Sequence, residues 1–148
     1  MSADVHALYQ QAILDHSRSP RNCRAIEGGR KAEGYNPICG DRITVHVRVE
    51  GDVIEDVSFQ GSGCAILKAS ASLMTESIKG RTVADAGALV DRLQRMILAP
   101  PGAPIENLGA LAALAGVRLF PTRIKCATLP WHTLRAAADA CHDAVSTE

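Results

Sequence analysis

The chain has 148 residues, in which 16 Lys and Arg balance 16 Asp and Glu, and aromatic residues make up only 3%. Without a net charge, the chain lacks the general electrostatic attraction of nucleic-acid-binding and membrane-surface proteins, and it has few side chains on which bases could stack. The length suits a single domain, residues 1–148, which would bury roughly 70% of its unfolded surface without a disulfide framework.

The cysteine content and the hydropathy pattern favour an intracellular chain. Five cysteines cannot all form pairs. Met1 leads into a polar, amphipathic segment, and no apolar run reaches the ~18 residues of a membrane span. We therefore expect reduced thiols and a cytoplasmic location.

The first predicted element is an amphipathic helix over residues 4–17, which ends before Pro20 because a residue preceding proline is disfavoured in the α region. His6 and His16 lie on this helix. A single helical histidine is far more often a surface residue than a ligand, so neither is assigned a role. Cys23 follows the proline and is expected to be a bystander. The apolar face of the helix comprises Val5, Leu8, Tyr9, Ala12 and Ile13.

Three strands are predicted next. A short edge strand is expected near Lys31–Tyr35, and residues 43–49 alternate apolar and polar side chains, with His46 on the wetter face. Residues 53–59 return antiparallel to them. The apolar side chains stay on one face if the loop has three residues, Glu50–Asp52, or if the hairpin contains a bulge. The three-residue loop would pair Val49 with Val53, Val45 with Val57, and Ile43 with Phe59.

Helices dominate the rest of the chain. Cys64–Lys79 is helical in pattern, and Thr82 resembles the N-cap of a third helix that runs to about Met96. Residues 98–104 contain three prolines and form a loop. The final elements are a short apolar helix, Asn107–Ala115, ended by Gly116, and a last helix from Pro121 to about Ala140.

Three cysteines and one aspartate stand where thiolates would be stabilised. Cys39 lies in a glycine-containing turn two residues before Asp41, and the hairpin brings this turn to the sheet end at which Cys64 leaves it. At the start of a helix, backbone N–H groups favour a negative charge on Cys64. Lys125 and Arg123 favour a negative charge on Cys126 in the same way. Three thiolates and a carboxylate make a plausible tetrahedral zinc shell.

One sequence pattern is spread over five regions of the chain. The regions are Leu8–Gln11 with Ile13–His16, Pro20–Asn22, Asn36–Asp41, Gly61–Ile66 with Ala69–Ser72, and Lys125–Ala127. This pattern resembles the U-type iron–sulfur cluster assembly proteins over roughly residues 8–135. The IscU branch of that family has histidine before its last cysteine, where this chain has Lys125. Cys126 follows Cys64 by 62 residues (126 − 64), which leaves room for an extra helical segment. Both features resemble the SufU branch.

The resemblance implies an α+β fold, with helices packed on one face of a three-stranded antiparallel sheet, as in the SufE/NifU-like folds. It implies that Cys39, Asp41, Cys64 and Cys126 bind one Zn²⁺. It also implies that the protein accepts persulfide sulfur from a SufS-type, PLP-dependent cysteine desulfurase and stimulates that enzyme, upstream of other cluster-assembly proteins. Our hypothesis is that Cys39 is the acceptor. Arg123 and Lys125 would give electrostatic support to the anionic site.

Two alternatives use the same residues. The four side chains could hold a transient [2Fe–2S] cluster on a scaffold that passes it to apo-proteins, since one carboxylate ligand would make a cluster labile. They could instead form a structural zinc site in an interaction domain, in which case removal of zinc would unfold the chain. Cys141, near the C-terminus, is expected to be a second bystander.

Overall fold

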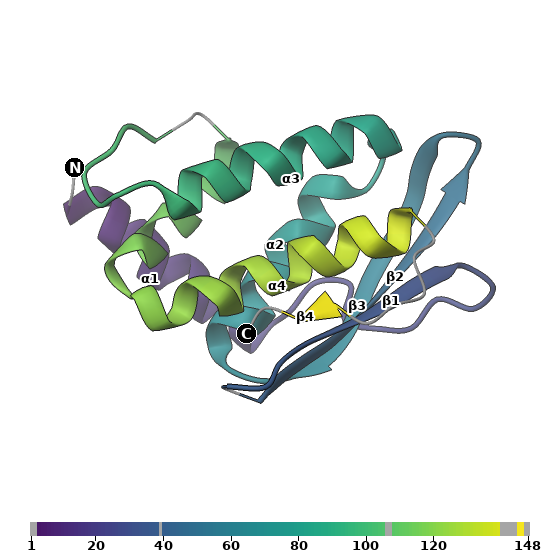
Figure 1. Ribbon diagram of the computed structural model, residues 1–148, viewed down its shortest axis with the longest axis horizontal. Helices are drawn as coiled ribbons and strands as arrows, with labels where there is room; N and C mark the ends of the chain where they lie inside the picture. Colours follow the sequence, from purple (N-terminus) through teal and green to yellow (C-terminus); the bar gives the residue numbers. More distant parts are fainter. Residues whose placement is uncertain (1–2, 39, 106–107, 140–144, 147–148) are drawn as a thin grey trace.

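The computed structural model describes residues 3–38, 40–105, 108–139 and 145–146. Its helices pack on one face of a sheet, as Figure 1 shows. This arrangement confirms the predicted α+β class. In chain order the elements are α1 (Ala3–Arg18), β1 (Arg30–Asn36), β2 (Asp41–Glu50), β3 (Val53–Ser62), α2 (Ala65–Ile78), α3 (Val83–Leu98), the 3-10 helix η1 (Gly109–Leu119), α4 (Pro121–Ala138) and β4 (Val145–Ser146).

The sheet has the order β3-β2-β1-β4. The first three strands are antiparallel, as predicted. Sequence analysis did not predict β4, which pairs in parallel with β1 through Gly34 and Val145. The sheet thus gains a short fourth strand at the β1 edge.

The predicted three-residue hairpin loop is wrong, and the alternative, a bulge, is what forms. Glu50 pairs directly with Val53, which leaves a two-residue loop. The register then shifts between Arg48 and Val49, so that Glu55 has no cross-strand partner. The bulge returns the apolar side chains of β3 to the inner face of the sheet and leaves Glu55 exposed.

The helices form two layers over the sheet. α4 packs on β1 and β2, and α2 packs on β3 and α4. Outside them, α3 contacts α4 and η1, while α1 contacts α2 and η1. The core lies between these layers, and Trp131 and Leu134 of α4 are buried in it as predicted. This packing holds the start of α2 and the early turns of α4 against one end of the sheet.

Three local predictions are corrected. His16 is buried, not on the surface, because α1 packs against α2 and brings the imidazole to Ser72. His46 is also buried, with Nε2 3.2 Å from Gln60 Oε1 on the neighbouring strand. Gly116 does not end a helix but lies inside η1, where its missing side chain makes room for α1.

Candidate metal centre

Asp41 begins β2 and is buried beneath the start of α2. Its neighbour across the sheet, Asn36, shapes the loop between β1 and β2. The side-chain oxygen of Asn36 accepts the N–H of Ile38 at 3.0 Å, and its carbonyl accepts the N–H of Gly40 at 2.8 Å. These bonds pair polar backbone groups of the turn within the turn itself. They also fix the backbone from which the Asp41 side chain points inward.

Cys64 is the N-cap of α2. Its sulfur accepts the backbone N–H of Leu67 at 3.5 Å. A free helix N-terminus presents unpaired N–H groups and the positive end of the helix dipole, so a negative charge on this sulfur is favoured. The helix therefore starts on a residue that serves as a cap and as a candidate ligand.

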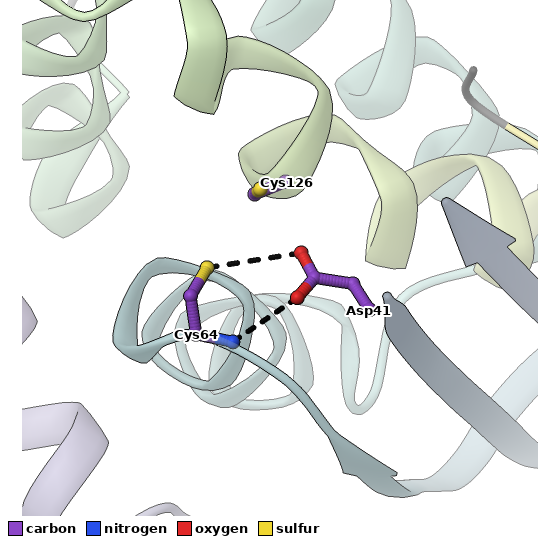
Figure 2. A group of neighbouring side chains, drawn as sticks. All are labelled: Asp41, Cys64 and Cys126. Carbon is purple, nitrogen blue, oxygen red and sulfur yellow. Dashed lines mark hydrogen bonds between the residues drawn. The ribbon is translucent and has the colours of Figure 1, made fainter. Parts of the chain in front are cut away.

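Asp41 and Cys64 are joined directly. The carboxylate accepts the Cys64 backbone N–H through Oδ1 at 3.1 Å, and the thiol of Cys64 donates to Oδ2 at 3.7 Å (Figure 2). Gly63 permits this approach, since a Cβ there would lie 2.9 Å from Asp41 Cγ and 2.7 Å from a methyl of Leu67. The glycine before the cysteine is thus a steric requirement of the site.

Cys126 comes from the second turn of α4 and completes the group. It is fully buried, and Figure 2 shows its sulfur facing the space shared by Asp41 and Cys64. One ligand atom from each of the three residues lies within 4.8 Å of the others. Three elements that are far apart in the sequence therefore meet at one point.

Arg123 is a cation linked to this group. It lies one turn before Cys126 on α4 and is exposed. Hydrogen bonding to Cys126, followed by the negative charge of Cys64, raises the pKa of the guanidinium above its ordinary value. Lys125 is exposed beside Cys126, so both predicted supporting cations lie on the same helix as a candidate ligand.

The donor set fits zinc. A tetrahedral site with Zn–S of about 2.3 Å and Zn–O of about 2.1 Å separates a sulfur from an oxygen by roughly 3.6 Å. The separation of Cys64 Sγ and Asp41 Oδ2 is 3.7 Å. Two thiolates and one carboxylate also match the ligand types that zinc prefers. The separation of this pair thus matches that of two ligands on one zinc ion.

Three cysteines named in the sequence analysis remain to be placed. Cys39, the fourth predicted ligand and predicted sulfur acceptor, lies outside the described residues, as does Cys141. Cys23 is a free, exposed thiol, and its backbone pairs with Phe59. It is not part of the group of Asp41, Cys64 and Cys126.

Sequence reasoning missed Tyr9 as part of the surroundings of the site. It was assigned to the apolar face of the first helix and to the family pattern, yet burial, followed by the negative charge of Cys64, raises the pKa of its phenol to about 12. A tyrosine on an otherwise aliphatic face was a sequence signal, because its hydroxyl must be placed somewhere.

Comparisons with known proteins agree with this geometry. Residues 8–127 match the family described as the NifU-like N terminal domain. The zinc-dependent sulfurtransferase SufU of Bacillus subtilis is 41% identical over 133 residues, which cover 90% of each chain. The iron–sulfur cluster assembly scaffold protein IscU of Streptococcus pyogenes is 39% identical, over 90% of this chain and 84% of that protein.

Solved structures give the same result. The crystal structure of a putative iron–sulfur cluster assembly scaffold protein for the SUF system, from Fervidobacterium islandicum, superimposes with a TM-score of 0.81. It is 36% identical and covers 90% of this chain and 98% of its own. Among the described residues, no helix has the length and apolar character needed to cross a membrane.

Proposed function

Because the chain belongs to the NifU-like N-terminal domain family, we propose that it serves iron–sulfur cluster assembly as a zinc-dependent sulfur acceptor. The observation that carries this proposal is the convergence of Asp41, Cys64 and Cys126, whose ligand atoms lie within 4.8 Å of one another. The SufU relative of Bacillus subtilis, named as a zinc-dependent sulfurtransferase, supports it.

Cys39 is the proposed fourth ligand and the proposed acceptor. Cys39, Asp41, Cys64 and Cys126 would hold the zinc ion, which would keep the ligand sulfurs deprotonated. The Cys39 thiolate would attack the outer sulfur of a persulfide on the desulfurase. A new S–S bond forms at Cys39, the S–S bond of the donor breaks, and the donor cysteine leaves as a thiolate. The exchange needs no external oxidant or reductant.

The other residues would prepare this step. Asp41 provides an oxygen ligand, which is a harder donor than sulfur. The four ligands would therefore hold the metal less tightly than four thiolates would. Arg123 and Lys125 offset the negative charge of the ligands, and Arg123 does so through its hydrogen bond to Cys126. The partner in this proposal is a SufS-type, PLP-dependent cysteine desulfurase in the cytoplasm.

The test is desulfurase activity with and without this protein, with metal content measured on the same sample. We expect about one zinc per chain and a higher desulfurase rate when the protein is present. Cys39→Ala should abolish the stimulation, whereas Cys23→Ala, which removes an exposed thiol outside the site, should not. If Cys39→Ala still accepts labelled sulfur at the normal rate, Cys39 is not the acceptor.

A scaffold role is the second candidate, favoured by the IscU relative of Streptococcus pyogenes. The same thiolates and carboxylate can ligate a [2Fe–2S] cluster. Anaerobic purification separates the two roles, because a colourless protein containing zinc supports sulfur transfer and a brown protein containing iron and sulfide supports the scaffold.

A further inference from the structure

The face of the sheet opposite α2 and α4 carries a hollow of about 540 Å³, at the end where β2 begins and β3 ends. Successive side chains of a strand point to opposite faces. Asp41 is therefore buried toward the candidate metal centre, while its neighbour Arg42 is exposed on the other face. The hollow is thus distinct from the metal centre, although both lie at the same end of the sheet. Its polar side chains are Glu33, Tyr35, Arg42, Thr44, Gln60 and Ser62.

Strand pairing arranges these six side chains in two rows across the sheet. One row is Tyr35, Arg42 and Ser62, and the next is Glu33, Thr44 and Gln60. Glu33 and Arg42 are diagonal neighbours in adjacent rows, and the backbones of such neighbours lie roughly 7–8 Å apart. A negative and a positive side chain therefore stand far enough apart to flank a molecule of a few atoms.

Neither of these two charges is used by the fold. Glu33 and Arg42 are both exposed, and within the part of the chain that the structure describes neither takes part in an ion pair or a side-chain hydrogen bond. By contrast, Arg48 and Glu55, farther along the β2–β3 hairpin and outside the hollow, pair with each other at 3.6 Å. The charges of Glu33 and Arg42 are therefore available to a ligand.

Hydrogen-bond donors surround the guanidinium of Arg42. Gln60 Oε1 lies 3.2 Å from Nε2 of the buried His46, which leaves the amide nitrogen of Gln60 as a donor. The two neighbours of Arg42 in its row each add a hydroxyl. The guanidinium itself presents its N–H groups in a fork that matches a carboxylate. One part of the hollow thus suits a carboxylate, and Glu33 suits an ammonium group beside it.

We propose that this hollow binds a free α-amino acid as its zwitterion, with the α-carboxylate on Arg42 and the α-ammonium group on Glu33. The volume lies within the range of small-molecule sites, roughly 300–1,000 Å³. A ligand with both charges pairs both side chains, whereas a simple anion or cation would leave one of them without a partner as it covers the hollow. The proposal does not depend on metal binding or on sulfur transfer.

The test titrates the full chain with L-alanine and follows the ¹H–¹⁵N NMR spectrum. L-Alanine carries both charges and no thiol or imidazole with which it could bind zinc. We expect saturable shifts in the amide signals of Gly34, Thr44 and Gly61, which line the hollow. Propionate and ethylamine each keep one of the two charges, and each should bind about 10-fold more weakly, because one charge-assisted hydrogen bond is lost.

Matched variants assign the two charges. Glu33→Gln and Arg42→Gln should each weaken L-alanine binding about 10-fold. The controls are Glu55→Gln and Arg48→Gln, which remove the same two charges from the exposed pair outside the hollow and should match the wild type. Absence of saturable shifts in the wild type, propionate that binds as tightly as L-alanine, or wild-type affinity in Glu33→Gln would each overturn the proposal.

Titrations of the chelated and the zinc-loaded chain separate the hollow from the metal centre. We expect the same L-alanine affinity in both, because the hollow lies on the other face of the sheet. An affinity that appears only with zinc would place the ligand at the metal and overturn the proposal. A chain that binds L-alanine but no zinc would defeat the proposed function and leave this inference standing.

Discussion

His16 is a buried titratable side chain at the contact between α1 and α2. Its Nδ1 lies 2.7 Å from Ser72 Oγ, and its Nε2 lies 3.8 Å from a carboxylate oxygen of Glu76. Burial lowers the pKa of His16 below its ordinary value of 6.5, and the positive charge of Arg21 lowers it further. Glu76 and Asp15 oppose this shift without reversing it. The folded chain therefore favours the neutral imidazole.

This shift predicts a loss of stability in mild acid. Between the lowered folded pKa and 6.5, the unfolded chain binds more protons at His16 than the folded chain does, so the free energy of unfolding falls as pH decreases through 6.5 towards the folded pKa. The slope is at most about 1.4 kcal/mol per pH unit for one histidine. His16→Gln should flatten it, as measured by urea unfolding at several pH values.

A residual slope is expected in that variant. Burial lowers the pKa of His132 as well, so this residue contributes with the same sign. His132→Gln is therefore the companion measurement. If His16→Gln keeps the full wild-type slope, His16 does not contribute to the acid sensitivity.

Individual residues were predictable from the sequence where their chemistry is local. Cys64 could be chosen because a helix start leaves a side chain beside unpaired backbone N–H groups, and Asp41 because it follows Cys39 by two residues in a glycine-containing turn. The burial of His16 was not predictable, because it depends on how α1 docks on α2. The burial of Tyr9 follows from the same kind of docking, against Gly116 in η1.

At the scale of elements, the packing of α2 on α4 sets the separation of two candidate ligands. Ser70 of α2 donates to the backbone carbonyl of Ala127 at 2.6 Å and accepts the indole N–H of Trp131 at 3.0 Å. All three groups are buried. Cys64 caps one helix and Cys126 lies on the other, so this polar contact fixes the two sulfurs relative to each other.

Ser70→Ala should destabilise the protein by about 1–3 kcal/mol, because it leaves a buried indole N–H and a buried carbonyl without partners. Ser77→Ala, half-buried near the end of the same helix, is the control for the loss of a serine hydroxyl. Urea unfolding followed by tryptophan fluorescence measures both variants. Equal stabilities of the two variants would show that the contact contributes nothing beyond side-chain size.

In the β2–β3 hairpin, the sequence pattern did not determine how the two strands are connected. Both a three-residue loop and a bulge keep apolar residues on the inner face, so periodicity could not choose between them. The deciding contacts are distant: Ile54 N–H donates to the carbonyl of Arg81, and its carbonyl accepts the N–H of Gly80, each at 2.8 Å. The bulge lets Ile54 point into the core while it makes these bonds.

At the scale of the whole molecule, the core extends far beyond the candidate metal centre. Buried apolar side chains run from the inner face of the sheet through α2 and α4 to α3 and η1. The three described candidate ligands contribute little to this volume. The fold should therefore hold without metal.

Chelation should lower the melting temperature while leaving the helical circular dichroism signal in place. Metal at 100 times its dissociation constant adds about 2.7 kcal/mol to the free energy of unfolding, and that increment alone is lost. Melting of chelated and zinc-loaded protein, with metal content measured, checks this outcome. Cooperative unfolding on chelation at 25 °C would instead favour the structural zinc domain.

The class of fold followed from the family resemblance, and the predicted elements agree with it, since period-two strands need a cover on one face and the amphipathic helices provide it. The fourth strand was not, since Val145–Ser146 is too short to carry a pattern and its partner β1 is more than 100 residues away. The 3-10 helix η1 was misjudged for a related reason: Gly116 resembles a terminator until the ring of Tyr9 is placed against it.

The candidate ligands Asp41, Cys64 and Cys126 come from β2, the start of α2 and α4, so 85 residues (126 − 41) separate the first from the last. During translation, the centre cannot be completed until α4 has left the ribosomal exit tunnel. Chains whose synthesis stops before that point offer only part of the ligand set, so they would not bind zinc firmly.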